Sequence, residues 1–173
     1  KIDTSQNTTF YGNVTKPNNC SVYVTWVLGG NTVTSGTYTY YPANVGTVTE
    51  DRDAGGDFAS GVFTAPVQGS YLFTAMGRPD DVSNYANDQI SEIRFQIQKS
   101  TDSGSTWAGE KYPLIWIDPR AIDAYNDPFG WSGSATIYLN SGDQLRPEYY
   151  FKITGGTARV DLNNVYFQIH LLG

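Results

Sequence analysis

Three aspartates around a pair of glycines are the residues of this chain best suited to hold a cation. Asp51, Asp53 and Asp57 flank two consecutive glycines at positions 55 and 56. Carboxylate oxygens on a glycine-rich loop are the hard ligands that Ca²⁺ prefers. The spacing departs from the EF-hand loop, because Val62 stands where that loop has its final glutamate. These aspartates are therefore a candidate calcium site, a plain solvated turn is the preferred interpretation, and the sequence requires no cofactor.

Candidate catalytic residues are few. His170 is the only histidine and no G-x-S-x-G sequence accompanies it, so a serine or cysteine triad is not expected. Cys20 is the only cysteine, which excludes an internal disulfide and, with a single histidine, a conventional zinc site. Carboxylates that could act as the acid and base of a glycan hydrolase are Glu50, Glu92, Glu110 and Glu148. Because they are spread over the chain, we expect no enzymatic activity, and a small glycan hydrolase is the catalytic alternative.

Aromatic residues in a loop-like stretch indicate ligand binding. The candidate binding residues are Tyr125, Asn126, Asp127 and Trp131. Aromatic rings stack on sugars and are frequent in protein interfaces, and the amide and carboxylate beside them suit a polar ligand. Core packing is the alternative for each ring, and it is the preferred interpretation for Trp107 and Trp116.

Alternation of apolar and polar side chains predicts the strands that would position these residues. It is clear in the segments 22–28, 93–97, 135–139, 158–162 and 165–171, which are separated by glycine, asparagine and aspartate turns. The chain has 18 glycines and 13 tyrosines, and long helix-forming residues are sparse. Many short strands joined by such turns are typical of an antiparallel sandwich or barrel. A length of 173 residues fits a single domain, 1–173, with its own core.

The segment GVFTAPVQGSYLFTA, residues 61–75, predicts a hairpin with one buried face. It resembles the C1q/TNF-like superfamily, whose signature is G-x-F-T-x-P-x-x-G-x-Y-x-F. The matching residues are Gly61, Phe63, Thr64, Pro66, Gly69, Tyr71 and Phe73. The segments SATIYLNSGDQLRPEYY and VYFQIHLLG are similar to the penultimate segment and last strand of that family. The resemblance covers residues 45–173 and implies an all-β, double-sheet antiparallel jelly-roll sandwich, with residues 1–44 as N-terminal strands or a collar.

The resemblance also implies a homotrimer, because such heads pack aromatic and aliphatic side chains along a threefold axis. The candidate interface residues are Tyr149, Phe151 and Tyr166. The alternative for these residues is the core of a single protomer.

A second motif, S-x-D-x-G-x-T-W, occupies residues 100–107 and is similar to the Asp box of sialidases and other β-proteins. In that motif the aspartate caps a hairpin turn and the tryptophan packs beneath it, which suits the ability of aspartate to bond its own backbone. Sialidases carry several copies on propeller blades, whereas this short chain has one. We therefore predict a structural hairpin here and not a sialidase.

Charge and hydropathy exclude two classes of partner. The net charge is -6 and the 11 basic residues are scattered, so a nucleic-acid surface is not expected. No apolar run is long enough to insert into a membrane. We expect a non-catalytic, trimeric recognition or attachment head of a viral, phage or bacterial fibre, spike or surface protein. It would act extracellularly or on a virion surface and bind a host-surface glycan or a protein receptor. A monomeric carbohydrate-binding module is the main alternative.

Overall fold

A computed structural model describes residues 20–34, 38–42, 47–53, 55–77, 90–107, 111–118, 130–153 and 157–172. Regular structure in these ranges consists of strands, and no described segment is a helix long and apolar enough to cross a membrane. The strands are β1 (Ser21–Thr34), β2 (Tyr38–Pro42), β3 (Thr47–Asp53), β4 (Phe58–Ala59), β5 (Val62–Thr64), β6 (Gly69–Gly77), β7 (Ile90–Ser100), β8 (Lys111–Ile117), β9 (Trp131–Leu139), β10 (Gln144–Ile153) and β11 (Thr157–Leu171).

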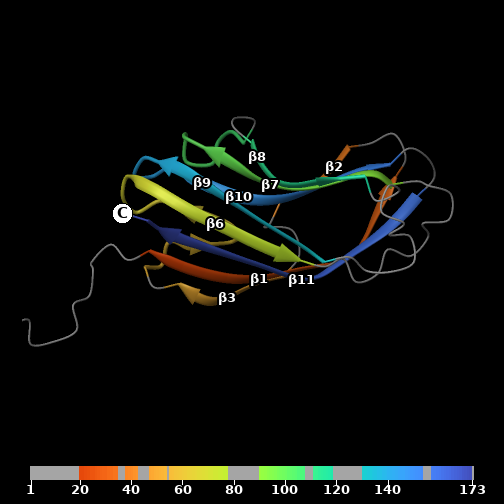
Figure 1. Ribbon diagram of the computed structural model, residues 1–173, viewed down its shortest axis with the longest axis horizontal. Helices are drawn as coiled ribbons and strands as arrows, with labels where there is room; N and C mark the ends of the chain where they lie inside the picture. Colours follow the sequence, from red (N-terminus) through yellow and green to blue (C-terminus); the bar gives the residue numbers. More distant parts are fainter. Residues whose placement is uncertain are drawn as a thin grey trace, which may run out of the picture.

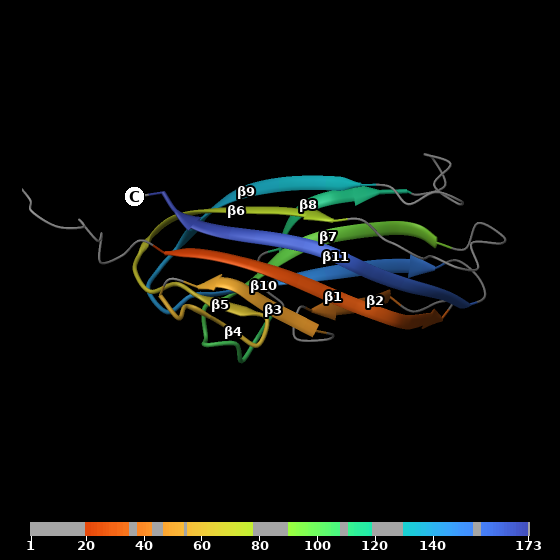
Figure 2. The ribbon, with the colours of Figure 1, turned by 90° about the horizontal axis from the view of Figure 1, so that it is seen from below.

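The strands form two antiparallel sheets that pack face to face (Figure 1). The five-stranded sheet has the order β3-β1-β11-β6-β9, which Figure 2 shows from below. The six-stranded sheet has the order β4-β5-β10-β7-β8, with β2 paired to β10 next to β5. Strand β1 lies before residue 45, outside the part of the chain that resembles the superfamily. It is nevertheless paired on both sides, with β3 and with β11. The prediction of a double-sheet antiparallel jelly-roll sandwich is confirmed.

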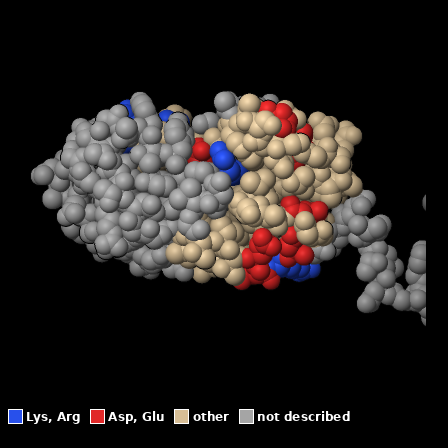
Figure 3. Space-filling view, turned by 180° about the vertical axis from the view of Figure 1, so that it is seen from behind, with Lys and Arg blue, Asp and Glu red and all other residues tan. Residues whose placement is uncertain are grey.

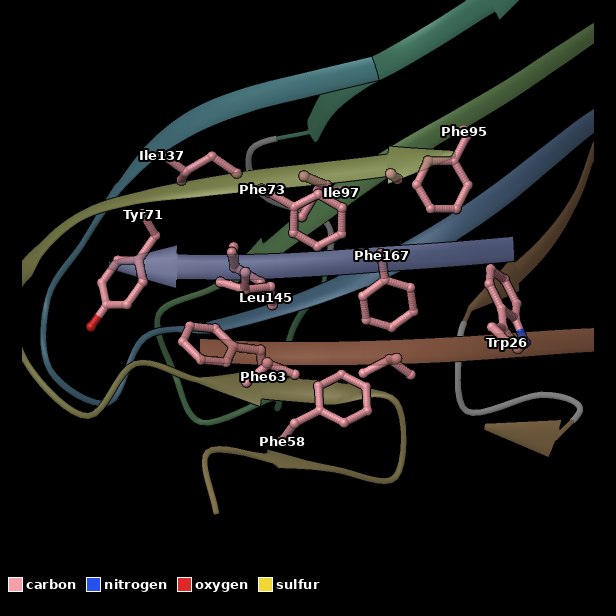
Figure 4. Close-up of a cluster of buried hydrophobic side chains, with 14 of the residues drawn as sticks. Trp26, Phe58, Phe63, Tyr71, Phe73, Phe95, Ile97, Ile137, Leu145 and Phe167 are labelled. Atoms are coloured by element: carbon pink, nitrogen blue, oxygen red, sulfur yellow. The ribbon is translucent and has the colours of Figure 1, made fainter. Parts of the chain in front are cut away.

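The core lies between the sheets and is rich in aromatic rings. Trp26 of β1 and Tyr149 of β10 come from opposite sheets and pack with their ring centroids 5.6 Å apart. Phe73 of β6 and Phe167 of β11 stack at 5.7 Å within the five-stranded sheet (Figure 4). Trp26, Phe73 and Phe167 alternate with half-buried neighbours along their strands, as the period-two pattern predicts. On β10 the two neighbours of Tyr149 are buried as well.

The segment 61–75 is not a hairpin, so that prediction is wrong. Strand β5 belongs to the six-stranded sheet and β6 to the five-stranded sheet, and the turn between them crosses from one sheet to the other. Phe63 and Tyr71 still point into the same core, with their ring centroids 5.4 Å apart. Gly61 has a φ of 79°, a backbone conformation that favours glycine. One buried face is therefore shared by two strands that do not pair with each other.

A second crossing lies directly beside the first. The turn at residues 140–143 joins β9 of one sheet to β10 of the other. The Gly142 amide donates to the Ala65 carbonyl at 2.8 Å, and the Ala65 amide donates to the Asp143 carbonyl at 2.9 Å. The Ser141 hydroxyl adds a bond of 3.0 Å to the Pro66 carbonyl. The two crossings thus hold each other at one end of the sandwich.

Candidate functional site

The aspartates predicted to bind calcium form hydrogen bonds within the protein. Asp53, at the end of β3, accepts amide hydrogen bonds from Asp57 at 3.0 Å, Phe58 at 2.9 Å and Gly55 at 3.3 Å. Asp51 accepts a hydroxyl hydrogen bond of 2.7 Å from Thr25 on the neighbouring strand. Asp53 therefore caps the loop that leads to β4, which is the role of an Asx turn.

Asp57 faces the buried thiol of Cys20. Burial, together with the Asp57 carboxylate that accepts its hydrogen bond, raises the pKa of the Cys20 thiol to about 12. Burial also raises the pKa of Asp57, while the bond from the thiol opposes this effect. Among the described residues no group of three or more His, Cys, Asp or Glu is arranged to hold a metal ion. The three aspartates share one edge of the sandwich, where acidic side chains gather over β3 (Figure 3), but calcium binding stays a prediction.

Of the four predicted ligand-binding residues, Trp131 is the one that lies in a described range. Tyr125, Asn126 and Asp127 lie outside the described residues. Trp131, the first residue of β9, packs against the core, with its ring centroid 4.7 Å from that of Phe95. A β-carbon added at Gly77 would approach the Trp131 ring to 2.6 Å, so the glycine makes room for the indole. Trp131 thus packs against the core, which is the alternative to ligand binding that the sequence analysis gave for this ring.

Two of the three predicted interface residues lie in the protomer core. Tyr149 and Phe151 have 0% and 1% of their surface exposed and stack at 5.7 Å on the inner face of β10. Burial raises the pKa of the Tyr149 phenol well above its usual value, and the nearby Trp131 indole opposes this effect. Tyr166 of β11 is half-buried on the outer face of the five-stranded sheet, so it alone is positioned to meet another molecule.

The outer face of the five-stranded sheet carries aromatic and apolar groups around a shallow pocket. Tyr166 stacks on Tyr23 of β1 with ring centroids 6.2 Å apart. Met76 of β6 is 54% exposed beside it. A pocket of about 380 Å³ lies between β11, β6 and the start of β9, where Ser132 and Ser134 alternate with Gly133. Small residues of β9 and large residues of β11 and β6 together shape this concave, partly apolar surface.

The outer face of the six-stranded sheet is different, because polar pairs cross from β7 to β10. Gln96 donates to the Glu148 carboxylate at 2.5 Å, and both side chains are almost completely buried. Arg146 donates twice to the Gln98 amide oxygen, at 2.5 and 3.2 Å. Burial lowers the pKa of Arg146, and the neighbouring Glu148 carboxylate opposes this effect. Each pair joins residues in direct register, so the sheet itself fixes these groups.

Two tryptophans flank this polar ladder. Trp116 of β8 is 63% exposed, so its assignment to the core is wrong. The Arg94 guanidinium lies 3.9 Å from its ring centroid and 4.7 Å from that of Tyr150. Trp107 is half-buried under the Arg146 guanidinium, which lies 4.2 Å from its ring centroid. Both tryptophans are therefore held by arginines of the same sheet through cation–π contacts.

The motif at residues 100–107 forms the turn after β7, which leads to the paired strand β8. Asp102 accepts hydrogen bonds from the Thr106 amide at 2.9 Å, the Thr106 hydroxyl at 2.7 Å and the Ser100 hydroxyl at 2.6 Å. These bonds lower the pKa of the Asp102 carboxyl to about 2. Gly104 has a φ of 82° and lies against Trp107. Both carboxylate oxygens of Asp102 thus stabilise the turn.

The candidate hydrolase carboxylates do not converge in the described part of the chain. Glu110 lies outside the described residues, and Glu50 lies in β3 of the other sheet. Glu92 forms an ion pair with Arg94. On β7 it lies four residues from Gln96, the residue paired with Glu148, which separates the two glutamates by about 13 Å along the strands. Glycosidase carboxylates lie roughly 5 to 9.5 Å apart. His170 is half-buried on the outer side of β11, with its ring nitrogen 3.3 Å from Gln168.

Several of these residues were not singled out from the sequence. The segment KYPLIWI is apolar at almost every position, so it does not reveal that Trp116 faces outward. The sequence of β7 alternates clearly, and its polar positions include Arg94, Gln96 and Gln98. The alternation predicts that these side chains lie on the outer face, but it does not indicate which residues of β10 they contact.

Comparison with solved structures finds the same architecture. The fold is similar to Eiger TNF from S. frugiperda, with a TM-score of 0.52 and 12% identity over 90% of this chain and 94% of that chain. It is similar to the globular domain of zebrafish complement 1qA protein, with a TM-score of 0.53 and 15% identity over 90% of this chain and 98% of that chain. No protein-family model and no curated protein matches the chain by sequence. The chain therefore has the C1q/TNF-like jelly-roll fold that its signature at residues 61–75 implies.

Proposed function

We propose that this chain is a non-catalytic, homotrimeric recognition head that acts outside the cell. The observation that carries the proposal is the outer face of the five-stranded sheet, where Tyr166, Tyr23 and the exposed Met76 surround a shallow pocket. A cyclic trimer needs a contact in which one surface of a copy meets a different surface of the next. A concave, partly apolar surface is suited to that contact, because interface cores are depleted of charge and rich in aromatic residues and methionine.

The more specific role that we propose is the attachment tip of a fibre, spike or surface protein of a virus, phage or bacterium. The fold likeness supports a head domain. The receptor would be a host-surface glycan or a protein. The separation of Glu92 from Glu148, each with its own partner, supports binding without hydrolysis.

Light scattering coupled to size exclusion tests the trimer directly. The expected mass is about three times 19.1 kDa. Met76→Lys places a charge at the pocket and should shift the mass toward one chain, because a buried unpaired ammonium is strongly unfavourable. Trp116→Lys is the matched control, since it places the same charge at a similarly exposed apolar position on the other sheet. A monomeric wild-type chain at all concentrations, or dissociation by both variants alike, would contradict this proposal.

The same measurement in the presence of a chelator addresses the calcium prediction. Loss of the trimer on chelation would assign a structural ion to the region of Asp51, Asp53 and Asp57. An unchanged mass is the result expected if Asp53 acts as a loop cap, because its carboxylate is already satisfied by three amides.

A further inference from the structure

We propose that the outer face of the six-stranded sheet binds a neutral saccharide, with the Trp116 indole as its stacking platform. This inference rests on the proposed recognition role and names a class of ligand and a place for it. It moves the predicted glycan contact away from Trp131, which packs against the core.

The Trp116 ring is both accessible and fixed in position. It is 63% exposed on β8, and the guanidinium of Arg94 covers one side of the ring at 3.9 Å. Arg94 is held in turn by Tyr150 beneath it and by the Glu92 carboxylate beside it. A ring that is immobilised before binding loses little conformational entropy when a ligand stacks on it. Trp116 is therefore a preorganised flat surface on a rigid strand.

The surroundings of Trp116 favour a sugar over the other ligands of exposed aromatic rings. A protein hot spot needs neighbours that exclude water, and interface cores are depleted of charge. Here the nearest neighbours across the strands are Glu92 and Arg94, which are charged and polar. An anionic ligand is disfavoured because Glu92 neutralises Arg94 and the chain carries a net charge of -6. A pyranose fits, because it offers an apolar face to the ring and hydroxyl groups to the carboxylate and guanidinium.

The site at Trp116 is local, because the polar groups between it and Trp107 are buried: Gln96, Gln98 and Glu148 are 3%, 5% and 2% exposed. Arg146, which covers Trp107, lies four residues from Tyr150 along β10, a distance of about 13 Å. The polar pair of Gln98 and Arg146 lies along this line and keeps its donors and acceptors fixed by the sheet. Because the two glutamines and Glu148 are buried, the proposed saccharide contact is confined to the exposed Trp116 ring and to the neighbouring Arg94 and Glu92.

The test uses a defined panel of glycans and the full chain. The neutral members are dextran, galactomannan and a mixed-linkage β-glucan, and the anionic members are heparin and polygalacturonate. Binding is measured by affinity electrophoresis and by the shifts of the tryptophan indole N–H signals in NMR spectra. We expect at least one neutral glycan to bind, to shift the Trp116 signal, and to bind equally well at 0.15 and about 1 M salt, since neutral ligands are not screened.

Substitutions assign the site. Trp116→Ala should weaken binding by about tenfold or more, whereas Trp116→Phe, which keeps a flat ring, should retain most of it. Tyr138→Ala is the matched control, because Tyr138 is 55% exposed on the outer face of the other sheet, and it should leave binding unchanged. Failure of all three neutral glycans to bind, or equal binding by wild type and Trp116→Ala, would overturn the inference. Salt-sensitive binding to the anionic glycans alone would also overturn it.

The mass of each variant separates this inference from the proposed function. A trimer that binds no neutral glycan overturns the saccharide site and leaves the recognition head intact. A monomer that binds a neutral glycan through Trp116 supports the site and refutes the trimeric head. Trp116→Ala should keep the wild-type mass, because its position lies on the sheet opposite the proposed contact between copies.

Discussion

Replacing Tyr149 with phenylalanine should make the protein more stable, which is unusual for a change at a completely buried position. The Tyr149 hydroxyl and the Trp131 indole N–H are buried, and within the described residues neither has a hydrogen-bond partner of normal geometry. The two rings lie edge to face, with centroids 5.8 Å apart. The indole N–H is near enough to oppose the rise in the pKa of Tyr149, but it does not meet the geometry of a hydrogen bond. Phenylalanine keeps the ring and its packing against Phe95 and Phe151.

The size of the effect follows from the cost of an unsatisfied hydroxyl. Burying a polar group without a partner costs about 1 to 3 kcal/mol. Part of that cost remains in the variant, because the Trp131 indole N–H stays buried. We therefore expect the free energy of unfolding to increase by about 1 kcal/mol, which corresponds to a rise in Tm of roughly 2 to 4 °C for a chain of this length.

Tyr71→Phe is the matched control and should change stability in the opposite direction. The Tyr71 ring is equally buried, but its hydroxyl donates to the Val67 carbonyl at 2.6 Å. Removing that bond should lower the free energy of unfolding by about 1 kcal/mol. Urea titrations and calorimetry at one fixed protein concentration would compare both variants with wild type. If Tyr149→Phe is destabilised as much as Tyr71→Phe, the Tyr149 hydroxyl has a partner and the reasoning fails.

Three further predictions concern the carboxylates and the thiol. Asp53→Ala should lower the free energy of unfolding by about 1 to 2 kcal/mol in a denaturant titration, because three loop amides lose their acceptor, and it should do so with or without calcium. Carboxyl NMR should show Asp102 titrating with a pKa of about 2. The stability that its ionised carboxylate contributes is therefore fully present above pH 3.8, the ordinary pKa value, and is lost as the pH falls through about 2. A midpoint near 3.8 would show that the hydrogen bonds to the turn are absent. Cys20, with a pKa of about 12, should resist thiol reagents at pH 8 until the protein unfolds, whereas fast labelling of the native protein would contradict its burial.

Strand positions could be predicted from the sequence because burial of one face imposes a period of two on each strand. The alternation around Ile93 and around Phe167 corresponds to β7 and β11 as the structure has them. The partner of each strand could not be predicted in the same way. At residues 61–75 the inward side chains have the same spacing whether the two strands pair with each other or lie in opposite sheets. Local periodicity reports which side is buried, and it contains no information on which strand is the neighbour.

The site residues were harder to predict because one residue type serves different roles. Asp53 lies in a sequence that fits a cation loop, but backbone amides of its own loop satisfy the carboxylate. Trp116 and Trp131 are both tryptophans near strand ends, yet one is exposed and the other packs on Phe95. The exposure of each indole depends on the residue paired with it on the next strand. Trp116 is paired with Arg94, whose side chain lies on the outer face, whereas Trp131 is paired with Gly77, which leaves space for the indole. Such contacts join segments far apart in the chain, so sequence spacing does not reveal them.

The paired crossings at one end of the sandwich set a condition on how the chain folds. The bond between Ser141 and Pro66 spans 75 residues, and the amide bonds between Ala65 and the Gly142–Asp143 turn close a loop of similar length. Neither crossing has its partner until both have been synthesised, and the entropy of closing the loop must be overcome before the bonds form. During translation this end would stay open until Asp143 has left the ribosome. We therefore expect folding to be a late and slow event, on the millisecond-to-second scale typical of nonlocal β topologies.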